Sequence, residues 1–212
     1  MGYSFTKRVI DILGSTFLIL LFSPIIIFTS LAIALTSKGP IFYTKERVGM
    51  HGKLFKSYKF RSMIVNAYEL LKTDPRFKKA YEEQQKSGVY KIKKDPRITS
   101  VGKFIRKHSI DEIPQFFNVL KGEMSIVGPR PYYPEELDTQ QKKFPGTKDM
   151  VKEMLTVKPG ITGYWQVSGR SEVTFDKRIE MDAYYARKRS ILLDLLILLK
   201  TPWIMISGKG AY

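Results

Sequence analysis

The sequence contains no cysteine and only two histidines, His51 and His108, among its 212 residues. Without cysteine the chain has no disulfide framework and no thiolate nucleophile. The two histidines lie far apart in the sequence, which argues against a histidine metal site and against a Ser-His-Asp triad. Chemistry must therefore be sought among carboxylates, lysines, arginines and bound ions. The absence of cysteine also suits a protein that faces the cytoplasm.

Acidic residues are scarce relative to basic ones. The chain has 20 Asp and Glu against 36 Lys and Arg, which gives a formal net charge of +16. Such an excess implies an anionic partner: nucleic acid, anionic lipid or a phosphorylated substrate. No recognisable nucleic-acid-binding motif is present, and no internal repeat. The length fits one domain with a sizeable core.

The longest apolar segment covers residues 12–35 and contains no charged residue. As a helix it would be about 36 Å long, enough to cross a bilayer, so length alone fits an ordinary transmembrane helix. A cleaved signal peptide is excluded because the apolar run is too long and no small-residue cleavage site follows it. This segment favours a membrane over nucleic acid as the anionic partner.

Two features of this segment argue for a re-entrant hairpin. Ser23-Pro24 lies near its middle, where proline removes a backbone donor and breaks the helix. Basic residues flank both ends, which the positive-inside rule assigns to the cytoplasm: Lys7 and Arg8 before, Lys38, Lys45 and Arg47 after. Each arm would be roughly 17 Å long, about half the hydrocarbon core. We expect a membrane helix-break-helix over residues 1–38, with Ser23 bonding to backbone groups at the break.

The remaining residues, 39–212, predict a cytoplasmic-facing α+β domain. Residues 41–48 and 54–60 favour two strands joined by a turn at 49–52, which makes a small antiparallel hairpin. Lys59 and Arg61 lie at its end. Lysine and arginine there are typical of a solvated sheet edge, where lysine guards against aggregation.

Asp111 and Glu112 form an acidic pair within a basic stretch, residues 106–131. Ser109 and Glu112 have the spacing of a capping box, which predicts Asp111 in the first helical turn, ionised by the helix dipole. An ionised aspartate can ligate Mg²⁺ or attack phosphorus. Pro114 allows the helix to begin one turn later or to be kinked. The alternative is that Ser-x-x-Glu only marks a helix start.

A stiff Gly-Pro-Arg-Pro turn follows at residues 128–131. It holds the guanidinium of Arg130 in a fixed direction, and arginine forks match phosphate oxygens at two points. A carboxylate pair, an optional divalent ion and a rigid arginine make a phosphoryl-transfer constellation. Arg106 precedes the pair, either as a helix C-terminal cation or as a partner of phosphate or carboxylate.

The other segments predict helices and turns. Residues 66–85 are highly charged and helical, with Pro75 splitting them. A rigid turn at 158–163 precedes a short strand at 164–167. A helix follows over 173–189. Residues 191–199 favour an amphipathic helix at the membrane interface, with Trp203 at headgroup depth, and a buried core helix is the alternative.

Three stretches resemble one family over nearly the whole chain, from Lys7 to Tyr212. They read SIDEIPQFFNVLKGEMSIVGPRP at 109–131, YKFRSM at 58–63 and KPGITGYWQVSGR at 158–170. They resemble the bacterial sugar transferases, the monotopic polyprenyl-phosphate phosphoglycosyl transferases. The third stretch and the terminal Gly-Ala-Tyr look most like the hexose-1-phosphate branch, galactose or glucose. An N-acetylated or deoxyamino sugar is the alternative. Lys158 stands where many relatives have arginine before Pro-Gly.

The resemblance implies transfer of a sugar 1-phosphate from a UDP-sugar to polyprenyl (undecaprenyl) phosphate, with release of UMP. This would start assembly of a membrane glycan on the cytoplasmic face of the bacterial inner membrane. It implies Mg²⁺ at Asp111 and Glu112 and two steps: Asp111 attacks the sugar-proximal phosphorus, and the lipid phosphate then displaces it. Glu112 either holds the metal or deprotonates the lipid phosphate. The implied substrate-binding residues are Lys59, Arg61, Arg106, Gly128, Arg130, Gln166, Arg170 and Asp182.

Two other functions fit the residues. A non-catalytic basic membrane adaptor would bind anionic lipid, but it has no need of an acidic pair beside a rigid arginine turn. A one-step, metal-assisted transferase would form no covalent intermediate. The oligomeric state stays open, with a homodimer among the alternatives, and no nucleic acid is expected as a partner.

Overall fold

The computed structural model describes residues 2–87, 92, 95–168 and 173–207. Within these ranges the chain has the predicted α+β fold and is mostly helical. It contains two small sheets: the predicted antiparallel hairpin and a parallel pair that the sequence did not predict. The helices are α1 (Gly2–Leu21), α2 (Ser23–Thr36), α3 (Ala67–Thr73), α4 (Lys78–Ser87), α5 (Ser100–Lys107), α6 (Gln115–Lys121), α7 (Pro134–Lys143), α8 (Lys148–Met154), α9 (Tyr164–Ser168), α10 (Phe175–Lys188) and α11 (Ile191–Ser207). The strands are β1 (Phe42–Val48), β2 (Leu54–Phe60), β3 (Ser125–Val127) and β4 (Gly160–Thr162), and short 3₁₀ helices are η1 (Met50–Gly52), η2 (Pro75–Phe77), η3 (Ile110–Glu112) and η4 (Pro145–Thr147).

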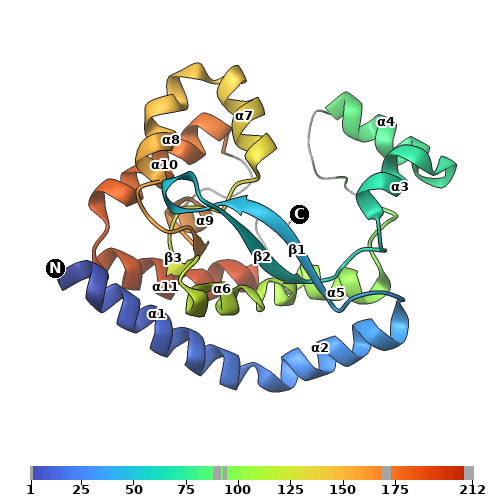
Figure 1. Ribbon diagram of the computed structural model, residues 1–212, viewed down its shortest axis with the longest axis horizontal. Helices are drawn as coiled ribbons and strands as arrows, with labels where there is room; N and C mark the ends of the chain where they lie inside the picture. Colours follow the sequence, from blue (N-terminus) through green and yellow to red (C-terminus); the bar gives the residue numbers. More distant parts are fainter. Residues whose placement is uncertain (1, 88–91, 93–94, 169–172, 208–212) are drawn as a thin grey trace.

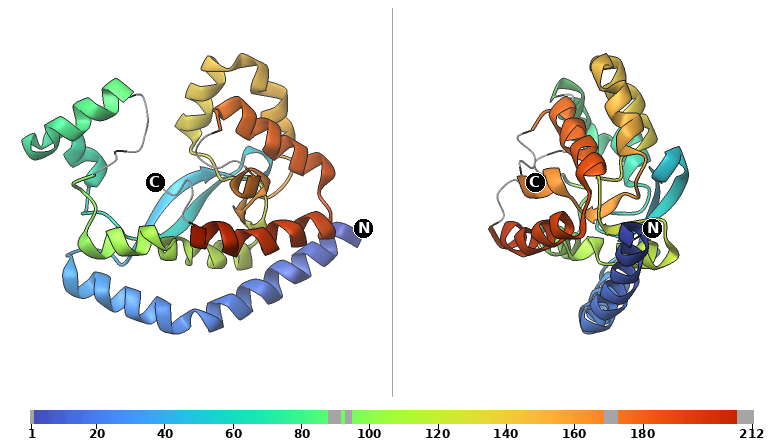
Figure 2. Two further views of the ribbon diagram at one scale, coloured as in Figure 1. Left: turned by 180° about the vertical axis from the view of Figure 1, so that it is seen from behind. Right: turned by 90° about the vertical axis from the view of Figure 1, so that its left-hand side faces the viewer.

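Helices α1 and α2 form a shallow V along one side of the molecule, with α5, α6 and α11 running above it (Figures 1 and 2). The two helices are bent by 59° at the predicted break, Ser23-Pro24. No single described helix has the length and apolar content of a membrane span, whereas this bent pair meets both requirements together. The predicted helix-break-helix is therefore present.

The arms of the V are longer than predicted. Helix α1 has 20 residues and α2 has 14, so they measure about 30 and 21 Å. The extra length of α1 lies before the apolar run, where Arg8 and Asp11 bind the body of the protein. Many apolar side chains of the pair face outward, among them Phe17, Phe28 and Leu35. They present a surface suited to lipid.

Strands β1 and β2 pair antiparallel, with Phe42 opposite Phe60 and Val48 opposite Leu54. The turn between them uses two left-handed residues, His51 at φ 57° and Gly52 at φ 76°. Both the hairpin and its turn agree with the prediction. The second sheet, β3 and β4, is parallel and buried, and it delivers the chain directly into the Gly-Pro-Arg-Pro turn.

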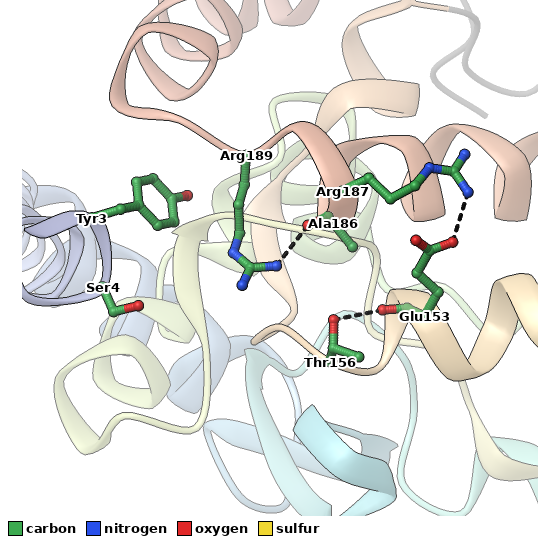
Figure 3. A pocket seen from close by; sticks show the side chains of 7 residues that line it. All are labelled: Tyr3, Ser4, Glu153, Thr156, Ala186, Arg187 and Arg189. Carbon is green, nitrogen blue, oxygen red and sulfur yellow. Dashed lines mark hydrogen bonds and ion pairs between the residues drawn. The ribbon is translucent and has the colours of Figure 1, made fainter. Parts of the chain in front are cut away.

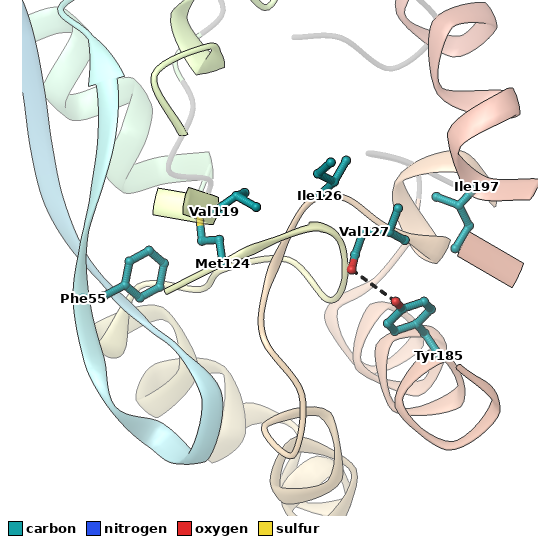
Figure 4. Packing of buried hydrophobic residues seen from close by; sticks show 7 residues of the cluster. All are labelled: Phe55, Val119, Met124, Ile126, Val127, Tyr185 and Ile197. Atoms are coloured by element: carbon teal, nitrogen blue, oxygen red, sulfur yellow. Dashed lines mark hydrogen bonds between the residues drawn. The ribbon is translucent and has the colours of Figure 1, made fainter. Parts of the chain in front are cut away.

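The main core lies between β2, β3, α6, α10 and α11 (Figure 4). Its buried members come from all five elements and the loop before β3: Phe55, Val119, Met124, Ile126, Val127, Tyr185 and Ile197. The hydroxyl of Tyr185 donates to the carbonyl of Val127 at 3.1 Å. This bond ties α10 to the strand that precedes the turn.

The predicted strand at residues 164–167 is wrong, because this segment forms the helix α9. Trp165 is buried, and Val167 donates its amide to the carbonyl of Gly163 at 3.2 Å. Aromatic and β-branched residues favour strands only where a neighbouring strand accepts them. Here α9 packs on α10 and α11 instead.

Helix α11 combines features of both alternatives considered for it. Ile197 is buried in the main core, whereas Leu192, Leu199 and Trp203 are exposed. One face therefore packs on the protein and the other is free, as an amphipathic interfacial helix requires. Contact of this face with a membrane stays a prediction.

Helices α3 and α4 stand apart from the body at one end of the molecule (Figure 1). Pro75 opens the 3₁₀ turn between them, as predicted. They enclose a small core of their own, which includes Leu71, Phe77 and Ala80.

Candidate active site

The acidic pair lies in η3, a single 3₁₀ turn between α5 and α6. Ser109 has φ 55° and its side chain caps no backbone amide, so the predicted capping box is wrong. A left-handed residue cannot adopt the extended conformation of an N-cap. Helix α6 begins one turn later, after Pro114, as the alternative prediction had it. Proline is tolerated there because the first helical amides need no internal partner.

Lys59 joins the acidic pair from the end of β2. Its ammonium bonds to Oε1 of Glu112 and lies 4.0 Å from Oδ2 of Asp111. The side chain of Asp111 is 13 % exposed and that of Glu112 is 37 % exposed. The strand hairpin thus brings a cation to two carboxylates more than fifty residues further along the chain.

The two carboxylates have different electrostatic environments. Burial raises the pKa of Asp111 to about 6, the nearby charge of Lys59 opposes the shift, and Glu112 adds to it. Burial also favours a higher pKa for Glu112, but the charge and hydrogen bond of Lys59 outweigh it, so that pKa is lowered. The expectation that a helix dipole keeps Asp111 ionised is wrong, since one 3₁₀ turn has little dipole. The charge of Lys59 favours the ionised form of Asp111 instead.

Three arginines add positive charge around the pair. Arg106, in the last turn of α5, favours the ionised form of Asp111, and Arg130 does so for Glu112. The guanidinium of Arg130 lies 5.9 Å from the ring of Trp165. Its Nε is buried without a hydrogen-bond partner among the described residues. The arginines therefore make an environment that can bind an anion next to the acidic pair.

The third arginine, Arg47, is a site residue that sequence reasoning missed. It is 6 % exposed, donates to the carbonyl of Pro131 at 3.1 Å and stacks 3.3 Å from the ring of Tyr133. Its charge also lowers the pKa of Glu112. The signal was present in the alternation of the hairpin: Arg47 pairs with Phe55, and cross-strand partners share one face.

Asp182, predicted to bind substrate, is fully buried beneath the Gly-Pro-Arg-Pro turn. Its Oδ2 accepts from the backbone amide of Arg130 at 3.4 Å and from the hydroxyl of Tyr132 at 3.3 Å. Burial raises its pKa well above the usual range, despite these bonds. In this structure Asp182 therefore supports the turn from below, and its role toward substrate stays a prediction.

Gly128 is required by close backbone packing. A Cβ there would lie 2.4 Å from the carbonyl oxygen of Lys158 and 2.8 Å from the amide nitrogen of Gly160. Only glycine allows the turn to pack on the neighbouring strand this closely.

Two further predicted residues, Arg61 and Gln166, bond to backbone carbonyls in the described part of the chain. Arg61 is buried and donates to carbonyls at the end of α2. Gln166 donates to the carbonyl of Ile161 at 3.1 Å. Arg170 lies outside the described residues. Roles for these three in substrate binding stay predictions.

The acidic pair suits a divalent cation that shares its coordination with substrate. Within the described ranges no cluster of three or more His, Cys, Asp or Glu offers a protein-only metal site. Mg²⁺ is commonly held by one or two carboxylates together with substrate phosphates and water. The donor chemistry of Asp111 and Glu112 fits this kind of site, with Glu112 paired to Lys59 here.

A cavity of about 570 Å³ lies elsewhere, between the start of α1 and the ends of α8 and α10 (Figure 3). The charged side chains that line it have partners within the protein. Arg187 pairs with Glu153 at 2.7 Å, and Arg189 donates to the carbonyl of Ala186 at 2.6 Å. None of the predicted site residues lines it.

Comparison with known proteins gives one family. The family described as "Bacterial sugar transferase" matches residues 2–208. The chain is 44% identical over 212 residues to undecaprenyl-phosphate galactose phosphotransferase of Salmonella typhimurium, covering 98% of this chain and 42% of that protein. It is 41% identical over 211 residues to UDP-glucose:undecaprenyl-phosphate glucose-1-phosphate transferase of Klebsiella pneumoniae, covering 97% and 41%. It is 37% identical over 207 residues to exopolysaccharide production protein ExoY of Rhizobium meliloti, covering 97% and 88%. The chain thus spans about two fifths of the first two relatives and most of the third.

Proposed function

The chain belongs to the bacterial sugar transferase family, and from this premise we propose that it transfers a sugar 1-phosphate from a UDP-sugar to undecaprenyl phosphate, releasing UMP. The single observation that carries the proposal is the Lys59–Asp111–Glu112 cluster. It combines a carboxylate able to attack phosphorus with a cation that offsets the repulsion between anions. The product would start the assembly of a membrane polysaccharide.

We infer that the reaction has two steps. In the first, an oxygen of Asp111 attacks the sugar-proximal phosphorus, and the bond to the bridging oxygen breaks so that UMP leaves. In the second, an oxygen of the lipid phosphate attacks the same phosphorus and the bond to Asp111 breaks. The free carboxylate returns, and the lipid carries a diphosphate-linked sugar. The position of Asp111, 13 % exposed and 4.0 Å from the Lys59 ammonium, supports its role as the attacking group.

The neighbouring charges have separate roles in this scheme. Lys59 holds Glu112 and lowers the cost of bringing a phosphate to Asp111. We assign Arg130, whose guanidinium lies 5.9 Å from the ring of Trp165, to the developing charge on the leaving phosphate. A divalent cation bound by Asp111 and Glu112 would supply further positive charge at the phosphate oxygens. Glu112 either holds that cation or takes a proton from the lipid phosphate.

The bent pair of α1 and α2 supports action at a membrane. Its exposed apolar faces would place the protein in one leaflet, at the depth where a lipid phosphate and a nucleotide sugar from the cytoplasm can meet. The basic residues on both sides of the pair favour the cytoplasmic face of the bacterial inner membrane.

The direct test is UMP release across a panel of UDP-sugars with undecaprenyl phosphate and Mg²⁺. The names of the relatives include galactose, glucose and N-acetylgalactosamine, so the panel should contain all three. We expect a hexose, galactose or glucose, to support turnover. Absence of UMP with every sugar, combined with binding to anionic vesicles, would leave the chain as a membrane adaptor.

A further inference from the structure

Arg61 holds the end of the membrane hairpin to the strand that carries Lys59. The residue is 5 % exposed, and its guanidinium donates to three successive carbonyls just after α2. Nη2 donates to Ser37 at 2.9 Å and to Gly39 at 3.3 Å, and Nη1 donates to Lys38. These carbonyls lie just past the last residue of α2, and a planar fork with several donors binds all three together as a lysine cannot.

The surrounding packing leaves this junction little freedom. Gly39 has φ +116°, and a Cβ there would lie 2.5 Å from Cγ2 of Val65 and 3.1 Å from Nη1 of Arg61. Beside it, buried Ile33 of α2 and Phe60 of β2 belong to one apolar cluster. The end of α2 is therefore fixed to β2 by both polar and apolar contacts.

Lys59 and Arg61 are separated by one residue at the end of β2, so about 7 Å of chain joins the catalytic cluster to the hairpin. The amide of Arg61 also donates to the carbonyl of Ile41 at 2.9 Å, which continues the strand pairing past Phe60. The end of α2 is therefore tied to the same strand end as the catalytic cluster, and this link sets the height of the cluster relative to the membrane hairpin.

The other arm of the hairpin is bonded to the same site. Arg8 of α1 donates to the carbonyls of Val119 at 2.6 Å and Leu120 at 2.8 Å, at the end of the helix that follows the acidic pair. Asp11 accepts from Ser125 and Ile126 at 2.9 Å each, on the strand that leads to Arg130. Both arms thus contact elements that carry the cluster.

We propose that Arg61 is a positioning residue that fixes the height of Asp111 relative to the membrane, and so sets the transfer to the lipid phosphate. The inference rests on the two-step function proposed above. A water-soluble UDP-sugar can approach the site at any height, whereas the lipid phosphate is held at the headgroup level. An error of about 1 Å in such an approach can cost roughly a hundredfold in rate. Arg61 therefore acts on the second step and not on the first.

The test compares the two half-reactions in Arg61→Met and Arg61→Lys, with the protein in nanodiscs of phosphatidylethanolamine and phosphatidylglycerol. UMP release from UDP-sugar alone reports the first step. Transfer of the sugar phosphate from preloaded enzyme to added undecaprenyl phosphate reports the second. Arg76→Met is the matched control, because the side chain of Arg76 is 77 % exposed and contacts only its neighbours Asp74 and Phe77 in the described part of the chain.

In Arg61→Met we expect UMP release within about twofold of wild type and transfer to lipid at least tenfold slower, about 1.4 kcal/mol in activation free energy. Arg61→Lys should recover part of the transfer rate, and Arg76→Met should change neither step. An equal fall of both steps would make Arg61 a folding residue and overturn the proposal. A raised KM for UDP-sugar in the first step would make it a substrate ligand and also overturn it. If wild type itself releases no UMP without lipid, the two-step function fails instead.

A second measurement needs no turnover. Since the chain has no cysteine, a single Lys107→Cys change at an exposed position of α5 accepts an environment-sensitive fluorophore close to the acidic pair. Quenching by lipids with nitroxides at defined acyl positions then reports its depth. We expect Arg61→Met to shift or broaden this depth, whereas an unchanged quenching profile together with slow transfer would contradict the proposed mechanism.

Discussion

The hydroxyl of Ser23 donates a 2.8 Å hydrogen bond to the carbonyl of Leu20, which is the carbonyl left without an amide partner by Pro24. An α-helix pairs each carbonyl with the amide four residues later, and proline has none. The serine thus satisfies the polar group that the break exposes, in a segment whose neighbours are apolar. This pairing lowers the cost of the bend at membrane depth, and Pro24 causes the bend itself.

Restoring the amide should straighten the hairpin. In Pro24→Ala the 59° bend is expected to decrease, because the introduced alanine can donate its amide to the carbonyl of Leu20 and the run becomes one helix of about 50 Å. Some molecules should then span the membrane. Cysteines placed at Lys7 and at Lys45 should be labelled from the same side in the parent protein and from opposite sides in part of the Pro24→Ala population.

Ser23→Ala is the matched control for this experiment, since it keeps the proline and removes only the hydroxyl. It should retain same-side labelling. Opposite-side labelling of the parent protein itself would show that the hairpin is not re-entrant.

The pKa of Asp111 predicts a pH dependence of the first step. A carboxylate attacks only when ionised, and burial raises this pKa to about 6. UMP release from UDP-sugar alone should therefore fall as the pH drops through about 6 and be flat above it. In Lys59→Met the cation that opposes the shift is lost, so the inflection should move to higher pH as the plateau rate falls. If the inflection in Lys59→Met lies at the same pH as in wild type, Lys59 does not affect the pKa of Asp111.

The buried carboxyl of Asp182 should make the stability of the folded protein depend on pH. Its folded pKa is raised, so the folded protein binds a proton that the unfolded chain loses at about pH 4. Stability should therefore fall as the pH rises above about 4, by up to ~1.4 kcal/mol for each pH unit until the folded pKa is reached. Asp182→Asn imitates the protonated side chain and should remove this slope. Thermal unfolding between pH 5 and 8 measures it.

Asp182→Ala is the comparison for that experiment. It removes the acceptor for the Arg130 amide and the Tyr132 hydroxyl, so it should be less stable than Asp182→Asn at every pH. A wild-type slope that persists in the Asn variant would assign the pH dependence to other groups.

Local signals in the sequence predicted the elements that depend on local physics. Proline and the two basic flanks gave the break at Ser23-Pro24, and alternation gave the hairpin of β1 and β2. Pro75 gave the division of the charged segment after residue 66. Each of these follows from backbone geometry or side-chain period within a few residues.

Features that depend on distant partners could not be predicted in this way. The strand predicted at 164–167 is a helix because α10 and α11 cover it. The pairing of Lys59 with Glu112 joins two segments that are 53 residues apart. Ser109 adopts a left-handed conformation where α5 connects to η3. The capping-box spacing of the sequence gave no sign of this conformation. The acidic pair was found from sequence, whereas the environment that separates its two pKa values was not.

The nucleophile itself gives the last prediction. Asp111→Asn keeps the size of the side chain and removes the anionic oxygen that attacks phosphorus, so it should abolish UMP release. Asp111→Glu should also fail, mainly because the carboxylate is displaced by about 1 Å, an error that can cost roughly a hundredfold. Wild type given UDP-sugar without lipid should release up to one UMP per site and gain the mass of one sugar phosphate, mapped to Asp111.

Glu112→Gln is the matched variant, because it changes the adjacent carboxylate in the same turn. If Glu112 serves the metal or the lipid phosphate, this variant should still form the adduct on Asp111, more slowly, since the nucleophile is intact. An adduct mapped to Glu112 would exchange the two roles. If UMP appears only when both substrates are present, and no adduct survives a rapid quench, the phosphate passes directly from nucleotide to lipid. Asp111 and Glu112 would then act together as ligands of the divalent cation, and the charge of Lys59 would serve the direct attack of the lipid phosphate.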